Sequence, residues 1–164
     1  MISDDMQSAL FQQLNDEFSS AYLYLAMSAY CSHIDFSGAA RWLKMQYTEE
    51  QSHATRIYNY LIEQGAHVVL RDIASPPSEF GTILEVFHSS LKHEQMMTAK
   101  LNNLSDHALR EKDHATYNLL QWFVNEQVEE EASVTELIDR LKLAGDKGHM
   151  LYMIDRDLSS RKYS

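Results

Sequence analysis

Glu50 and His53 lie three residues apart in the segment T-E-E-Q-S-H-A-T-R-I-Y, residues 48–58. This spacing places both side chains on one face of a helix. The rest of that face is the apolar stripe Leu43, Tyr47, Ala54, Ile57 and Leu61. Carboxylate and imidazole groups suit Fe(II), Mn(II) or Zn(II), but a single Glu-x-x-His pair is more often two solvated surface residues. A metal site therefore needs support from other parts of the chain.

Three further apolar stripes with helical spacing are interrupted near their centres by polar residues. Glu17 interrupts the stripe Leu10, Leu14, Ala21 and Tyr24. Glu94 interrupts the stripe Phe87, Leu91, Met97 and Leu101. Gln127 and Glu130 interrupt the stripe Leu120, Phe123, Val134, Leu137 and Leu141.

The positions of these interruptions repeat along the chain. The separation of Glu17 from Glu50 equals that of Glu94 from Gln127 (50 − 17 = 127 − 94 = 33). The two halves are offset by 77 residues (94 − 17 = 77). This repeat predicts two similar helical hairpins that carry their polar groups at the same height. Four independent surface acids would not be expected to match in this way.

Four carboxylates and one imidazole are thus expected in a single layer of the core, from Glu17, Glu50, Glu94, Glu130 and His53. Each unpaired buried charge would cost several kcal/mol. No lysine or arginine lies on these stripes near that layer. Four carboxylates and a neutral histidine would balance two divalent cations, so the pattern predicts a centre with two metal ions.

The elements that position these residues are helices. A 3.6-residue period fills the intervals between the five glycines and two prolines. It predicts helices at about 6–33, 38–64, 82–110, 114–144 and 148–159. Thr82 and Glu85 have capping-box spacing, and Asp113 is placed to cap the fourth helix.

The connections predict the topology. Short turns make the first two helices, and the third and fourth, antiparallel pairs. The connection from Gly65 to Gly81 spans up to roughly 55 Å when extended, whereas the second helix is roughly 40 Å long. We therefore expect an all-α four-helix bundle with one long crossover and a short fifth helix, forming a single domain over residues 1–164.

Composition limits the function classes. The chain has 164 residues, a formal charge of −10 and a pI of about 5.1, which disfavours nucleic acid as a partner. The first residues lack the positive charge and apolar run of a signal peptide, and no segment is apolar enough to span a membrane. With one cysteine, Cys31, no internal disulfide is available. These features indicate a cytoplasmic protein.

The sequence resembles the bacterial non-haem ferritins over nearly all of its length. The similar segments are EFSSAYLY at 17–24, EEQSH at 49–53, HEQ at 93–95, LLQWFVNEQVEEE at 119–131 and LYMIDRDL at 151–158. The resemblance implies an iron-storage protein with ferroxidase activity. It also implies a homo-oligomeric hollow shell of 24 subunits that holds a ferric mineral, with the fifth helix lining four-fold channels.

The resemblance also implies roles for individual residues. Glu17, Glu50 and His53 would bind one iron, and Glu50 would bridge to a second iron held by Glu94 and Glu130, with Gln127 close by. A third, more exposed iron site would use Glu49, Glu126 and Glu129, and Tyr24 would lie near the pair. Ser52 stands where bacterioferritins have a haem-binding methionine, so no haem is expected. The substrates would be Fe(II) and either O2 or H2O2.

Two other functions are also compatible with the sequence. The first is an oxygenase or peroxidase with a fixed di-iron cofactor, and the second is a non-catalytic metal buffer. Gln127-x-x-Glu130 stands where many di-iron bundles carry a second Glu-x-x-His pair. The second metal therefore lacks a histidine ligand, and we interpret this as a weakly held, exchangeable ion that favours iron storage. Tyr24 and Trp122 could supply electrons, although aromatic side chains in a bundle are more often packing residues.

Overall fold

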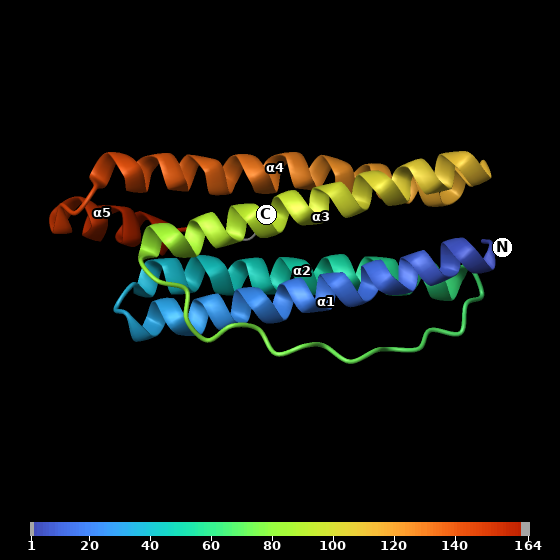
Figure 1. The fold of residues 1–164 in the computed structure, drawn as a ribbon, viewed down its shortest axis with the longest axis horizontal. Helices are drawn as coiled ribbons and strands as arrows, with labels where there is room; N and C mark the ends of the chain where they lie inside the picture. Colours follow the sequence, from blue (N-terminus) through green and yellow to red (C-terminus); the bar gives the residue numbers. More distant parts are fainter. Residues whose placement is uncertain (1, 162–164) are drawn as a thin grey trace.

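The computed structural model describes residues 2–161, which fold into five helices without a strand in that range (Figure 1). The helices are α1 (Asp4–His33), α2 (Ser37–Glu63), α3 (Ile83–Glu111), α4 (His114–Ala144) and α5 (Gly148–Leu158). Each predicted helix is present with its ends within two residues of the expected position. None of the described helices combines the length and apolar character that a membrane span requires.

The topology is the predicted one. α1 and α2 form one antiparallel hairpin, and α3 and α4 form the other. The segment between α2 and α3 runs along the length of the bundle (green in Figure 1), so that α2 and α3 are parallel. Thr82 and Glu85 form the expected capping box at the start of α3, and the Asp113 side chain accepts a hydrogen bond from the amide of Thr116.

The apolar core is divided into two clusters at opposite ends of the bundle. Along α1, one cluster includes Leu10 and Leu14 and the other includes Tyr24 and Met27, with Glu17 between them. The same division occurs in α2, α3 and α4. In each helix the predicted acids and amide fall between the two clusters. The repeated spacing of these residues therefore gives a polar layer across the middle of the bundle, as predicted.

α5 packs against α2 and α4, with Ile154 and Leu158 buried. Phe36 at the N-cap of α2 makes no side-chain cap of its own. Instead, the Asp155 carboxylate accepts hydrogen bonds from the amides of Gly38, at 2.9 Å, and Ala39, at 2.8 Å. α5 thus satisfies backbone donors that would otherwise be unpaired at the start of α2.

Gly38 lets α5 approach this closely, and substituting it should displace α5. A Cβ atom at residue 38 would lie 1.6 Å from the backbone oxygen of Asp155. We expect Gly38→Ala to release α5 and to cost at least about 1 kcal/mol from the lost cap. Faster hydrogen exchange in residues 148–158 would report the release. Gly148→Ala is the matched control because its Cβ would meet nothing within 4 Å, and equal exchange in the two variants would contradict the prediction.

Candidate metal centre

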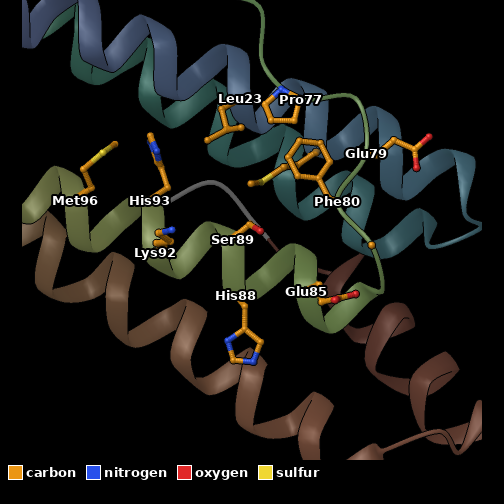
Figure 2. Close-up of a pocket in the computed structure, with 12 residues that line it drawn as sticks. Leu23, Pro77, Glu79, Phe80, Glu85, His88, Ser89, Lys92, His93 and Met96 are labelled. Atoms are coloured by element: carbon orange, nitrogen blue, oxygen red, sulfur yellow. The ribbon is translucent and has the colours of Figure 1, made fainter.

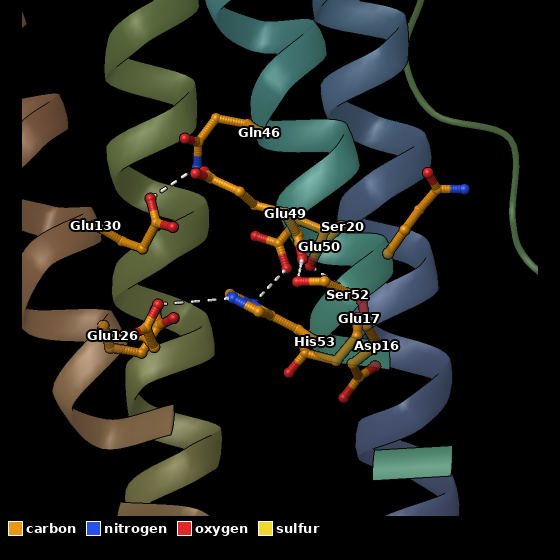
Figure 3. Close-up of polar contacts among 12 residues, drawn as sticks. Asp16, Glu17, Ser20, Gln46, Glu49, Glu50, Ser52, His53, Glu126 and Glu130 are labelled. Atoms are coloured by element: carbon orange, nitrogen blue, oxygen red, sulfur yellow. Dashed lines mark hydrogen bonds and ion pairs between the residues drawn. The ribbon is translucent and has the colours of Figure 1, made fainter. Parts of the chain in front are cut away.

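Three of the predicted metal ligands lie close together in the core of the bundle. Glu17, Glu50 and His53 are buried, and one ligand atom from each lies within 4.8 Å of the other two. His53 Nδ1 is 3.4 Å from Glu50 Oε2 and 3.8 Å from Glu17 Oε2 (Figure 3). Within residues 2–161, this is the one group of three or more potential ligands that converges so closely. Two carboxylates and one imidazole suit a divalent transition metal.

The remaining predicted core residues are buried at the same level but engaged elsewhere. Glu94 accepts hydrogen bonds from Tyr24 Oη and, at 3.0 Å, from Gln127 Nε2. Glu130 Oε2 accepts a hydrogen bond from Gln46 Nε2 at 2.7 Å (Figure 3). These hydrogen bonds hold the two carboxylates apart from the group of three. The structure therefore brings the first ligand set together, whereas hydrogen bonds to other side chains engage the second set.

Sequence reasoning missed three residues that hydrogen-bond to these carboxylates or to Tyr24. Gln13 Nε2 donates to Glu17 Oε1 at 2.7 Å, Gln46 donates to Glu130, and Ser90 lies 2.9 Å from Tyr24 Oη. Their spacing could have revealed them in the sequence, because each lies four residues before a predicted ligand. All three are buried polar residues one helical turn from an acid.

Protonation compensates part of the charge in this layer. Burial raises the pKa of Glu50 and of Glu94, and the charge of Glu17 raises both further. Burial, with the charges of Glu94 and Glu49, raises the pKa of Glu130 to about 7. Burial alone would lower the pKa of His53, but hydrogen bonds to Glu17 and Glu50 outweigh it and raise that pKa to about 11. The layer therefore holds protons that metal ions would displace.

Metal binding should consequently release protons. At pH 7, a pKa of about 11 keeps His53 protonated. A metal ion needs the neutral imidazole, so binding must expel that proton and must strengthen as the pH rises through the neutral range. We expect the release of about one proton or more per chain with the first Zn(II) ion. Calorimetric titration in two buffers of different ionisation enthalpy measures this number, and a value of zero would contradict the assignment.

The three acids of the expected third site are not gathered into one group in the described part of the chain. Glu126 Oε2 lies 4.0 Å from His53 Nε2, and its side chain is 35% exposed. Glu49 is partly buried and pairs with Arg161, whereas Glu129 is exposed. Glu49 and Glu126 thus border the central layer from α2 and α4. A third ion would require these side chains to move.

Two aromatic residues contact the centre. Tyr24 is fully buried and hydrogen-bonded to Glu94, and burial raises its pKa well above 10. The ring of Trp122 meets His53 edge-on, with 5.3 Å between centroids. The Arg56 guanidinium lies 4.0 Å from the centre of the Trp122 ring. Both aromatic residues therefore contact predicted ligands directly.

His93 lies outside the four polar stripes of the sequence but belongs to the surroundings of the centre. It is half-buried, and its Nε2 lies 2.7 Å from Ser20 Oγ. Its ring also meets Tyr24 edge-on, with 6.1 Å between centroids. His93 borders a cleft of about 950 Å³ between α1, α3 and the end of the crossover (Figure 2). The contact with Ser20 on α1 spans 73 residues, which helical periodicity does not reveal.

Comparison with known proteins identifies the family. A family model described as "Ferritin-like domain" matches residues 7–144. The chain belongs to the ferritin family. A bacterial non-heme ferritin of Staphylococcus aureus (strain MRSA252) is 40% identical over 163 residues, which cover 99% of this chain and 98% of that protein. A bacterial non-heme ferritin of Staphylococcus haemolyticus is 39% identical over the same shares of both chains.

Solved ferritin structures show the same fold. An engineered closed form of the Archaeoglobus fulgidus ferritin matches with a TM-score of 0.98 and 40% identity, covering all of both chains. The open-pore ferritin of that archaeon matches with a TM-score of 0.97 and 41% identity over 99% of this chain and 100% of that one. The resemblance to ferritins and the fold class inferred from the sequence are both confirmed. Membership of this family supports iron storage as the function of the chain.

Proposed function

We propose that this ferritin oxidises Fe(II) at a two-iron centre inside each subunit and deposits the ferric product in a hollow shell. The observation that carries the proposal is the buried group of Glu17, Glu50 and His53 in the polar layer between two apolar clusters. Buried charged groups of this kind are costly to desolvate and contribute little net stability to the core. It suits the binding of cations that enter and leave the bundle.

The two ions would occupy unequal positions. Glu17, Glu50 and His53 would hold the first Fe(II), and Glu50 would also reach the second. Glu94 and Glu130 would complete the second position, with Gln127 beside it. Because Gln127 and Gln46 hold Glu94 and Glu130 by hydrogen bonds, the second ion must break contacts to bind. We infer weaker binding of the second ion, which favours turnover over permanent retention.

The chemistry would be a two-electron oxidation. Each Fe(II) gives one electron and becomes Fe(III). With O2 as the acceptor, two electrons and two protons form H2O2; with H2O2 as the acceptor, two electrons and two protons form two water molecules. Protein carboxylates hold the two ions close together, as in two-metal sites generally. Tyr24, hydrogen-bonded to Glu94, would lie beside the two ions.

A third, weaker position would use Glu49, Glu126 and Glu129 on the borders of the layer. These carboxylates are more exposed than the central ligands, so the position would exchange ions with the surrounding solution. We propose that it passes iron between the two-iron centre and the cavity. The assembled particle would be a homo-oligomer of 24 subunits.

The testing experiment is aerobic loading with excess Fe(II), followed by size exclusion with iron and protein measured in the same fractions. Twenty-four chains of 19.0 kDa would form a particle of about 456 kDa. We expect iron to co-elute with that particle at far more than three ions per chain. Iron that stops at about two per chain would refute storage and favour a fixed di-iron cofactor. A small oligomer would refute the shell.

A further inference from the structure

Beyond the end of α5, Arg161 reaches the side of α2. Its Nη2 atom lies 2.8 Å from Glu49 Oε2, and its guanidinium lies 4.4 Å from the centre of the Trp42 ring. The two charged side chains are only 22% and 17% exposed. The ion pair is thus partly shielded from water, and the aromatic contact adds to its stability.

The position of Arg161 is set by α5, which is anchored to α2 and α4. Asp155 binds the amides of Gly38 and Ala39, and Asp157 accepts a hydrogen bond from Arg140 Nη2 at 2.8 Å. These contacts fix both the start of α2 and the last turns of α5. Arg161 follows α5 by three residues, so its approach to Glu49 is set by the docking of that helix.

Glu49 stands next to the ligand Glu50 on α2 and close to the second half of the centre. Figure 3 shows it beside Glu50, near Gln46 and Glu130. Its charge contributes to the raised pKa of Glu130. A guanidinium paired with Glu49 and a metal ion bound by Glu49 would both be positive and would compete for one carboxylate.

We propose that Arg161 is an internal cation that competes with iron for Glu49 and thereby sets the affinity of the third metal position. The inference rests on the third position described under the proposed function. Binding of a third ion expels the guanidinium from Glu49. Conversely, a guanidinium that stays on Glu49 lowers the binding affinity of that ion. The coupling is reciprocal, so the third ion also loosens the C-terminal segment from α2.

The test uses Zn(II), which does not change oxidation state, titrated calorimetrically into the assembled metal-free protein. We expect Arg161→Gln to tighten the weakest binding step about tenfold and to leave the two tighter steps unchanged. Arg156→Gln is the matched control because it removes the same charge from an exposed position on α5. It should leave all steps as in the wild type.

A second comparison separates competition from a general change in charge. Glu49→Gln should remove or greatly weaken the third step, and adding Arg161→Gln to it should have no further effect. If Arg161→Gln leaves the weak step unchanged, or if Arg156→Gln tightens it equally, the inference is wrong. If the first two ions bind but neither the wild type nor Arg161→Gln takes a third, the inference fails and the two-iron centre stands. Loss of the first two steps as well would refute the proposed centre itself.

Discussion

Replacing Glu50 and His53 together by alanine is expected to slow the initial aerobic oxidation of Fe(II) by at least about a hundredfold, which is an increase of about 2.7 kcal/mol in the activation barrier. The two residues supply two of the three ligands that converge in the central layer. In the proposed centre, Glu50 is also the carboxylate that would serve both ions. The double variant keeps Glu17, Glu94 and Glu130. It lacks the converging group that would bind the first ion, and a two-ion centre therefore cannot form around it.

The measurement is the initial rate of Fe(III) formation at two Fe(II) ions per chain, after subtraction of the rate without protein. Glu111→Ala with His107→Ala is the matched control, since it removes another helical Glu–His pair, 3.0 Å apart but at the surface. The control should oxidise iron within about twofold of the wild type. Size exclusion must show that both variants still assemble. An assembled double variant that oxidises iron at the wild-type rate would show that the chemistry lies elsewhere.

The parts of this fold that the sequence predicts are those encoded locally. Helix ends follow from periodicity, caps and the positions of glycine and proline, as the Thr82–Glu85 capping box illustrates. The polar layer follows from the repeated separation of the polar residues in two similar hairpins, which places them at the same height. Glu17, Glu50 and His53 meet for this reason, although nothing in their own segments brings α1 and α2 together.

The parts that escaped prediction depend on side-chain direction between helices. Gln46 could have bonded the acid one turn away on its own helix, as Gln13 does, but it reaches Glu130 on α4 instead. Asp155 and Arg161 contact α2 across separations of 116 and 112 residues. Periodicity identifies which face of a helix is buried. It does not identify which partner a long polar side chain selects on another helix.

The second large effect concerns the free energy of unfolding of a leucine variant relative to the wild type. Its sign is expected to reverse when metal binds. In the metal-free protein, Glu50→Leu with His53→Leu is expected to raise the free energy of unfolding by about 1–4 kcal/mol. This follows because well-packed apolar residues replace a buried polar pair whose burial is costly. The wild type should instead gain about 4 kcal/mol from an ion that binds one site at a concentration a thousand times its dissociation constant.

Native-state hydrogen exchange of the α2 amides around Gln46–His53 measures both effects in the assembled particle. Without metal, the leucine variant should exchange more slowly than the wild type. With saturating Zn(II), the wild type should slow by up to about a thousandfold, and the variant should respond far less. A leucine variant that is less stable in both conditions would mean that these residues serve packing. If the leucine variant is the more stable protein without metal and the wild type is the more stable one with Zn(II), the chain keeps a costly layer in its core because that layer binds metal.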